Sequence, residues 1–239
     1  MLAKLAVSSR RWLTYLPGFS LFHVSHAEPG GQLDPLGNPL VACGCPPRVR
    51  GAMRVVAGQL RGRKLLSVRG DTRPTMARAK AGLLDWLGPR VTGARVLDLF
   101  AGSGALGVEA LSRGAREAVF VERARGALKV LRRNLEELEL LHESRVVASD
   151  VGRALPLLAR DPEGFDLVFA DPPYRGDWLA RLATDANLVN LLSPVGVFIA
   201  ERSKREAPAE PVPELRLRES RRYGETAFDW YERAGEQGE

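Results

Sequence analysis

The twelve residues from Val96 to Gly107 read Val-Leu-Asp-Leu-Phe-Ala-Gly-Ser-Gly-Ala-Leu-Gly, an apolar run that passes directly into a glycine-rich loop. Gly102, Gly104 and Gly107 fit the pattern G-x-G-x-x-G, which joins a strand to a helix in dinucleotide-binding folds. Alone, the pattern is weak evidence for a ligand, because glycines also make tight turns. Its place between an apolar strand and a helix is the first indication of an α/β fold.

Strand-like and helix-like segments alternate around this loop. The expected strands are Arg95–Phe100, Glu117–Glu122, Arg145–Ser149, Asp166–Ala170 and Gly196–Glu201. The expected helices are Thr75–Leu87, Ala105–Arg113, Ala124–Leu141, one that includes Leu155–Leu158, and Trp178–Leu192. This alternation predicts a doubly wound, mostly parallel sheet of the Rossmann-like α/β class. Leu215–Arg221 and Thr226–Glu232 have no helix between them, so we expect an antiparallel hairpin at the C-terminal sheet edge.

We divide the chain into four parts, which are an irregular extension (1–52), a basic hairpin and helix (53–90), the α/β domain (91–233) and a polar tail (234–239). Three interpretations of the extension stay open. It is an organelle transit peptide, a small metal site made by His23, His26, Cys43 and Cys45, or upstream sequence that precedes a true start at Met53. We favour the last, because the cysteine and histidine spacing fits no common zinc site and a regular pattern begins at Met53.

The composition excludes several classes of protein. In 239 residues, 45% are hydrophobic and 27% are charged, which is typical of a globular chain with a real core. No apolar run reaches eighteen residues, so no membrane segment is expected. Two cysteines are too few for a disulfide framework, which favours a reducing cytoplasm.

Basic side chains are concentrated in one stretch. Between Arg54 and Lys80, eight basic residues stand against the single acid Asp71, so this window carries +7 while the whole chain carries +6. A local basic stretch beside a near-neutral domain is typical of a polyanion site, although a solvated face is the simpler alternative. The residues that we expect to contact nucleic acid are Arg54, Arg61, Arg63, Lys64, Arg73 and Arg78.

Two acids near the glycine loop distinguish between candidate cofactors. Asp98 would repel a pyrophosphate at the helix N-terminus. S-adenosylmethionine has an ammonium group, a sulfonium and two ribose hydroxyls, so carboxylates near its methionine part (Asp98) and its ribose (Glu122) both suit it. The expected cofactor-binding residues are Asp98, Ala101, Gly102, Gly104, Glu122 and Asp150. In the alternative interpretations, the glycines only turn the chain, Asp98 caps the helix and Asp150 is an N-cap instead of an adenine ligand.

The most specific motif is Asp171-Pro172-Pro173-Tyr174, which follows an apolar strand. An exocyclic base amine is a poor nucleophile, because its lone pair is delocalised into the ring. Two acceptors that hold its N–H groups favour a pyramidal nitrogen, and we assign these to the Asp171 carboxylate and the Pro172 carbonyl, in a turn stiffened by proline. Tyr174 would stack on the extruded base. A simple chain break is the alternative.

With these motifs in place, the chain from Met53 to Arg233 resembles the bacterial small-subunit ribosomal RNA guanine-N2 methyltransferases of the RsmD type. The matching residues are Arg54-Val55-Val56-Ala57-Gly58, Arg61-Gly62-Arg63-Lys64, Arg73-Pro74-Thr75 with Arg78, Asp98 to Gly107, Val121-Glu122, Asp171 to Tyr174 and Tyr223-Gly224. The chain departs from the family at Ala77 and Ala81, where acids are usual, and residues 1–52 have no counterpart.

The resemblance implies transfer of a methyl group from S-adenosylmethionine to guanine N2 in 16S ribosomal RNA, without a metal. It implies ribosomal RNA or the small ribosomal subunit as partner, and we expect a cytoplasmic monomer. Three alternatives stay open, namely an adenine-N6 methyltransferase on DNA or RNA, a non-catalytic RNA-binding protein with this fold, and a nicotinamide dehydrogenase, against which Asp98 argues.

Overall fold

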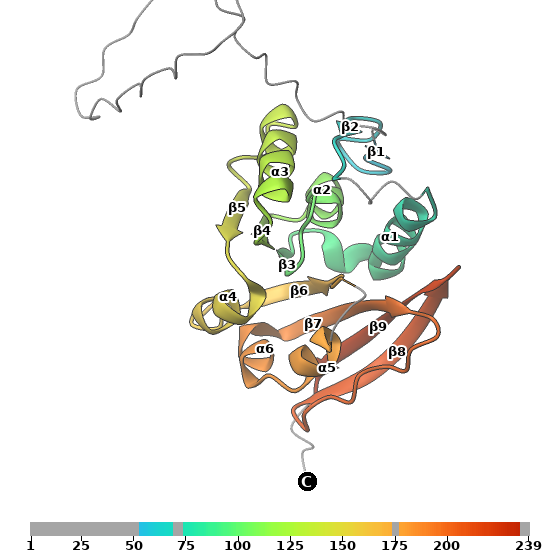
Figure 1. Ribbon diagram of the computed structural model, residues 1–239, viewed down its shortest axis with the longest axis vertical. Coiled ribbons are helices and arrows are strands. Elements are labelled where there is room, and N and C mark those ends of the chain that lie inside the picture. Colours follow the sequence, from blue (N-terminus) through green and yellow to red (C-terminus); the bar gives the residue numbers. More distant parts are fainter. Residues whose placement is uncertain (1–52, 69–73, 174–176, 235–239) are drawn as a thin grey trace, which may run out of the picture. The chain divides into compact units, whose positions relative to one another are not determined.

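The computed structural model describes residues 53–68, 74–173 and 177–234, which belong to one compact unit (Figure 1). The interpretations of residues 1–52, with their histidines and cysteines, lie outside the described residues, as do the assignments of Arg73 and Tyr174. For residues 74–77 only the backbone is described. Among the described residues, no helix is long and apolar enough to cross a membrane.

Within the described chain, seven strands form the central sheet, in the order β5-β4-β3-β6-β7-β9-β8. Their bounds are β3 (Arg95–Asp98), β4 (Glu117–Glu122), β5 (Ser144–Ala148), β6 (Phe165–Ala170), β7 (Leu192–Ser203), β8 (Leu215–Tyr223) and β9 (Thr226–Arg233). Strands β3 to β7 pair in parallel, whereas β9 pairs antiparallel with both β7 and β8. The predicted doubly wound sheet and C-terminal hairpin are confirmed, with β9 inserted so that β8 is the edge strand.

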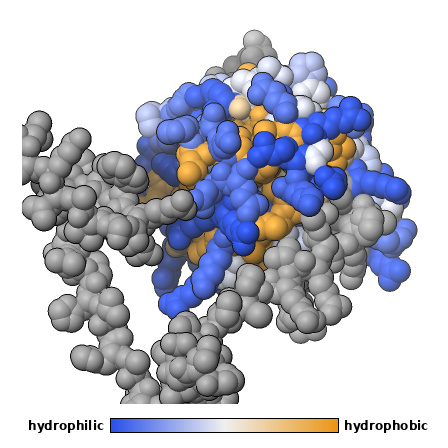
Figure 2. Space-filling view, turned by 90° about the horizontal axis from the view of Figure 1, so that it is seen from above, coloured by the Kyte–Doolittle hydropathy of each residue, from blue (hydrophilic) through white to orange (hydrophobic). Residues whose placement is uncertain are grey.

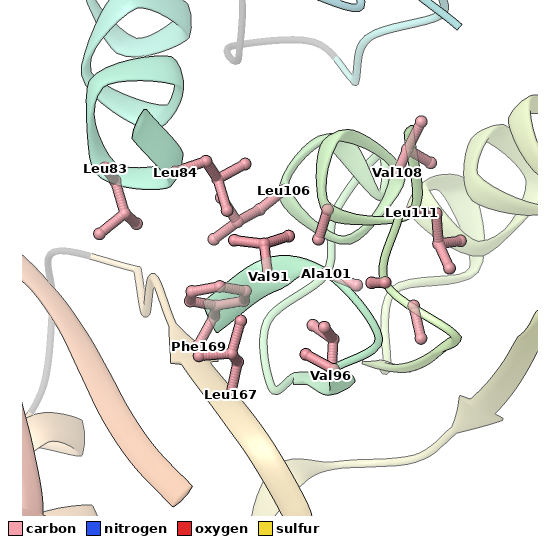
Figure 3. Packing of buried hydrophobic residues seen from close by; sticks show 14 of the residues in the cluster. Leu83, Leu84, Val91, Val96, Ala101, Leu106, Val108, Leu111, Leu167 and Phe169 are labelled. Carbon is pink, nitrogen blue, oxygen red and sulfur yellow. The ribbon is translucent and has the colours of Figure 1, made fainter. Parts of the chain in front are cut away.

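Helices cover both faces of this sheet, because β-strand side chains alternate between two apolar clusters. One face packs against α1 (Pro74–Leu87), the 3-10 helix η1 (Gly88–Val91), α2 (Ala105–Ser112) and α3 (Arg125–Glu137). The other packs against α4 (Val151–Leu158), α5 (Trp178–Ala183) and α6 (Ala186–Leu191). Figure 3 shows Leu83 and Leu84 of α1 directed toward Leu167 and Phe169 of β6.

The prediction of one helix over Trp178–Leu192 is wrong. Two short helices replace it, because Thr184 ends α5 and Asp185 caps α6 by accepting the N–H of Asn187. Leu192 already belongs to β7. The helix expected to reach Leu141 ends at Glu137, and the positive φ of 62° at Glu139 prevents its continuation.

The predicted N-terminal hairpin is confirmed as two short antiparallel strands, β1 (Met53–Arg54) and β2 (Lys64–Leu65). Buried polar side chains hold it against the helices. The Glu109 carboxylate accepts the N–H groups of Val56 and Ala57 at 2.8 and 2.9 Å. Asn134 of α3 accepts the N–H of Leu66 at 2.8 Å and donates to its carbonyl at 2.9 Å.

Ser112 adds a close approach between the hairpin and α2. Its hydroxyl donates to the Ala57 carbonyl and accepts the N–H of Leu60, while its carbonyl accepts the N–H of Gln59. Gly58 has a φ of 80°, and a Cβ there would clash with the Ser112 carbonyl. The hairpin is therefore docked on the domain through directional contacts.

Candidate active site

A cavity of about 400 Å³ opens where the parallel strands end, the edge at which ligands bind in doubly wound folds. The segments after β3, β5 and β6 and the end of β4 line it, together with Lys80 of α1 and Trp178 of α5. The sequence-predicted residues that line it are Ala101, Gly102, Glu122, Asp150, Asp171 and Pro172. Asp98 and Gly104 do not line it, so direct cofactor contacts of these two residues stay predictions.

Glu122 links the end of β4 to the glycine loop. One carboxylate oxygen accepts the N–H of Gly102 at 2.9 Å, and the other accepts the N–H groups of Arg123 and Ala124 at 2.8 and 2.7 Å. A carboxylate offers about four acceptor positions, so one stays available on a side chain that lines the cavity. This arrangement suits a ligand hydroxyl.

Asp150 is the N-cap of α4, because its carboxylate accepts the N–H of Gly152 at 3.0 Å. Its second oxygen is 3.2 Å from the guanidinium of Arg123. The N-cap alternative is thus confirmed, and a contact with adenine would use a side chain that is already positioned by these two partners.

Asp98 lies beneath the loop with 3% of its surface exposed. The backbone N–H groups of Phe100 and Gly107 donate to its carboxyl. Burial raises the pKa of Asp98 to about 7, an effect that Lys80 opposes and Asp171 reinforces. Because Gly107 belongs to the first turn of α2, the geometry supports the interpretation in which Asp98 holds the loop-to-helix turn.

The glycines of the loop are required by packing. Gly104 has a φ of 82°, and a Cβ there would clash with the Leu131 side chain. A Cβ on Gly107 would clash with Phe120 of β4. Packing against Leu131 and Phe120 is therefore sufficient to explain why positions 104 and 107 are glycine.

Asp171 forms an ion pair with Lys80, whose Nζ is 2.9 Å from Oδ2 of the carboxylate. In the sequence Lys80 is only the last cation of the basic window, but in the structure its side chain is 19% exposed and lines the cavity. Lys80 precedes Leu83 and Leu84 by three and four residues, so helical periodicity places it on the buried face of α1. That spacing was the signal for its role.

Glu201 is a second residue that the sequence analysis missed. Ala170 of β6 is paired with Ala200 of β7, so Asp171 and Glu201 follow at neighbouring positions. Glu201 is 5% exposed and hydrogen-bonded to Asp171. Burial and the adjacent Asp171 raise the pKa of Glu201 to about 8. Its signal was an acid directly after the apolar run Val197 to Ala200.

Aromatic side chains lie on the α5 side of the cavity. Phe100 and Trp178 meet edge to face with ring centroids 5.5 Å apart, and both line the cavity. Among all the described residues, the site included, no group of three or more His, Cys, Asp or Glu side chains is arranged to hold a metal ion.

The predicted RNA-contacting residues within the described chain, Arg54, Arg61, Arg63, Lys64 and Arg78, are all exposed. Arg54 donates to the Gly62 carbonyl, and Arg63 donates to the Glu137 carbonyl at 2.6 Å. Seen from above, the side that bears the hairpin presents mainly hydrophilic side chains around smaller apolar areas (Figure 2). Arg54 also lines a small cavity together with Lys80, so the hairpin adjoins the site.

Comparisons with known proteins agree with this architecture. Residues 53–232 match the family described as Conserved hypothetical protein 95. Ribosomal RNA small subunit methyltransferase D of Escherichia coli (strain K12) is 35% identical over 197 residues, which cover 79% of this chain and 93% of the relative. YlbH of Bacillus subtilis (strain 168) is 39% identical over 184 residues, 77% of this chain and 100% of the relative.

The solved structure of yhhF from Escherichia coli superimposes with a TM-score of 0.61 at 33% identity, covering 77% of this chain and 98% of that one. The family match spans about three quarters of the chain and includes the cavity, the glycine loop and the Asp-Pro-Pro turn. The chain therefore belongs to the Conserved hypothetical protein 95 family, that of the RsmD-type methyltransferases, and has their Rossmann-like fold.

Proposed function

We propose that this protein transfers a methyl group from S-adenosylmethionine to the exocyclic N2 of a guanine in small-subunit ribosomal RNA. The observation that carries the proposal is the position of the Asp171-Pro172-Pro173 turn on the lip of the same cavity that the Glu122-anchored glycine loop lines. The names of the relatives supply the substrate class, because the Escherichia coli protein is named for small-subunit ribosomal RNA.

The residues present fit S-adenosylmethionine. The cavity volume lies within the range of about 300–1,000 Å³ that is usual for ligand pockets. Glu122 offers a free acceptor position for a ribose hydroxyl, and Val121 and Val151 give the cavity apolar walls. The bound cofactor supplies an electrophilic methyl group on a cationic sulfur.

The residues of the Asp-Pro-Pro turn prepare the base. The Asp171 carboxylate and the Pro172 carbonyl accept the two N–H groups of the amine, which localises the lone pair on nitrogen. With the cofactor bound, its methyl group would pass to N2 while the sulfur keeps the electron pair of the broken carbon–sulfur bond, and the proton that N2 loses would pass to solvent. Lys80 fixes one Asp171 oxygen beforehand, so that little reorganisation is needed when the base enters.

The exposed cations of the hairpin would contact the RNA backbone next to this site. Phosphate contacts position a substrate and do not read its sequence, so Arg61, Arg63 and Lys64 would contribute affinity while the turn selects the base. We further propose that the protein acts as a monomer in the cytoplasm, which size-exclusion chromatography and cell fractionation would test.

The product distinguishes the candidate functions. We would incubate the protein with tritiated S-adenosylmethionine and small ribosomal subunits from cells that lack this activity, and digest the RNA for mass spectrometry. N2-methylguanosine at one nucleotide is the expected product. N6-methyladenosine would replace the base assignment, and absence of any methylated nucleoside with tight RNA binding would indicate a non-catalytic protein.

A further inference from the structure

Three carboxylates and one ammonium group meet beneath the Asp-Pro-Pro turn. Asp98, Asp171 and Glu201 come from the ends of three adjacent parallel strands, β3, β6 and β7. Val96, Phe169 and Ile199, each two residues earlier, all belong to the apolar cluster under α1. Strand alternation therefore directs the three acids to the face that α1 covers, where Lys80 is the cation.

Glu201 has few partners in this cluster. Although the residue is 95% buried, its Oε2 has no hydrogen-bond partner among the described residues, and within that part of the chain Glu201 is hydrogen-bonded to Asp171. The groups that face it are Lys80 from α1, Asp98 from β3 and Asp171 after β6. On β9 its paired residue is Phe228, which is apolar. A hydrogen bond between two carboxyl groups requires a proton on one of them.

The balance of charges in the cluster indicates that this proton is on Glu201. Burial, reinforced by Asp171, raises the pKa of Glu201 to about 8, and burial raises the pKa of Asp98 to about 7. Burial alone would lower the pKa of Lys80, but Asp171 and Glu201 together raise it. At neutral pH, the cluster therefore holds a charged Lys80 and a largely protonated Glu201.

We propose that Glu201 is a positioning residue that donates its carboxyl proton to Asp171 and, together with Lys80, fixes the Asp171 carboxylate for the base amine. The proposal rests on the proposed function of Asp171 in methyl transfer. In this role Glu201 would act on the base only through Asp171, without a contact of its own to the substrate.

A pH profile separates this task from a purely structural one. As the pH rises through about 8, Glu201 loses its proton, the donor disappears and a second negative charge adjoins Asp171. The rate of methyl transfer should therefore fall on the alkaline side. Glu201→Gln keeps a neutral donor at every pH, so its profile should stay level where the wild-type rate declines. Asp98 is present in both proteins, so the difference between them reports on Glu201.

The experiment is a single-turnover assay from pH 6.5 to 9.5, with tritiated S-adenosylmethionine and unmethylated small ribosomal subunits. We expect a wild-type decline with a midpoint near 8, a level Glu201→Gln profile, and a loss of about tenfold to a hundredfold in rate for Glu201→Ala at pH 7. Glu163→Gln, an exposed acid that precedes β6 at the opposite edge of the sheet, is the matched control and should follow the wild type.

Three results would overturn the proposal: a wild-type rate that does not decline, a Glu201→Gln profile that declines like the wild type, or a Glu201→Ala variant with full activity. Thermal unfolding of each variant identifies any loss of fold, and the wild-type profile tests the proposal without a substitution. Asp171→Ala in the same assay distinguishes a failure of the Glu201 proposal from a failure of the proposed function. Full activity of Asp171→Ala would refute the proposed function itself.

Discussion

Two buried glutamates in this molecule have opposite surroundings. Glu109 of α2 faces donors, namely the N–H groups of Val56 and Ala57 and the guanidinium of Arg113 at 3.1 Å. Glu201 of β7 faces two other acids and a single cation, Lys80, and one of its oxygens has no hydrogen-bond partner among the described residues. The first arrangement stabilises a docked hairpin. The second brings several acids together in a buried place, which raises the pKa values of Glu201 and Asp98 and is typical of functional sites.

Burial of a charged residue does not reveal its task, whereas its partners do. Glu109 has a donor for each oxygen, so its removal would leave buried donors without acceptors. The acids around Lys80 outnumber their cation, so protons must compensate for the excess charge. We call Glu109 the hairpin anchor, and Asp98, Asp171 and Glu201 the carboxylate cluster. We expect substitutions of the anchor to change stability, and substitutions in the cluster to change the rate of methyl transfer.

The largest expected effect is that of Asp171→Ala on the rate. Loss of one preorganised acceptor should reduce kcat by about a hundredfold or more. The affinity for S-adenosylmethionine should change little, because the turn holds the base. Single-turnover kinetics and isothermal titration calorimetry measure the two quantities. Near wild-type turnover would show that the cluster is structural after all and would remove the contrast with Glu109.

Two glycines of the hairpin loop offer a matched pair. Gly58 and Gly62 have φ angles of 80° and 83°, but a Cβ on Gly58 would clash with the Ser112 carbonyl, whereas a Cβ on Gly62 has no neighbour within 4 Å. Gly62→Ala should lower the free energy of unfolding by about 1–2 kcal/mol, the cost of a left-handed conformation. Gly58→Ala should lower it by roughly 2–4 kcal/mol, because overpacking adds to that cost. Equal losses in urea denaturation would mean that the hairpin is not docked on α2.

Glu109→Ala tests the anchor itself. The N–H groups of Val56 and Ala57 lose their acceptor, so the free energy of unfolding should fall by roughly 1–3 kcal/mol. RNA affinity should decrease, since the hairpin carries the cations, while cofactor affinity should stay unchanged. Glu109→Gln retains one acceptor oxygen, so its free energy of unfolding should lie between those of the wild type and Glu109→Ala. A variant that loses rate at saturating RNA but keeps its stability would place Glu109 in the chemistry.

Much of the fold could be predicted from the sequence, because its signals are local. The run from Val96 to Gly107 shows a strand, a turn and a helix in direct succession, and the short Tyr223-Gly224-Glu225 link is compatible only with a hairpin. The break at Thr184 and Asp185 was missed, because an N-cap inside an apolar pattern resembles an exposed polar position.

The site was predicted only where its residues adjoin a motif. Asp171 and Glu122 follow apolar strands that the pattern identifies. Lys80 and Glu201 are separated from Asp171 by 91 and 30 positions, so their meeting depends on strand order and on the packing of α1. Lys80 in particular was counted with the basic window, because charge counting does not distinguish the two faces of a helix.

The smallest expected effect concerns the exposed cations of the N-terminal hairpin. Replacing Arg61, Arg63 and Lys64 together with Gln should weaken RNA binding and leave the unfolding free energy and the cofactor affinity nearly unchanged, because these side chains are exposed. If all three contact phosphate, the slope of log K against log salt should drop by roughly two to three units. The Arg63 hydrogen bond to the Glu137 carbonyl must then be exchanged for a phosphate, which favours the lower value. Replacing the exposed residues Arg116, Arg145 and Arg153 with Gln removes the same charge elsewhere and should leave the slope close to that of the wild type. An equal drop in both triple variants would mean that the RNA responds to net charge, and the docked hairpin would then have no special part in binding.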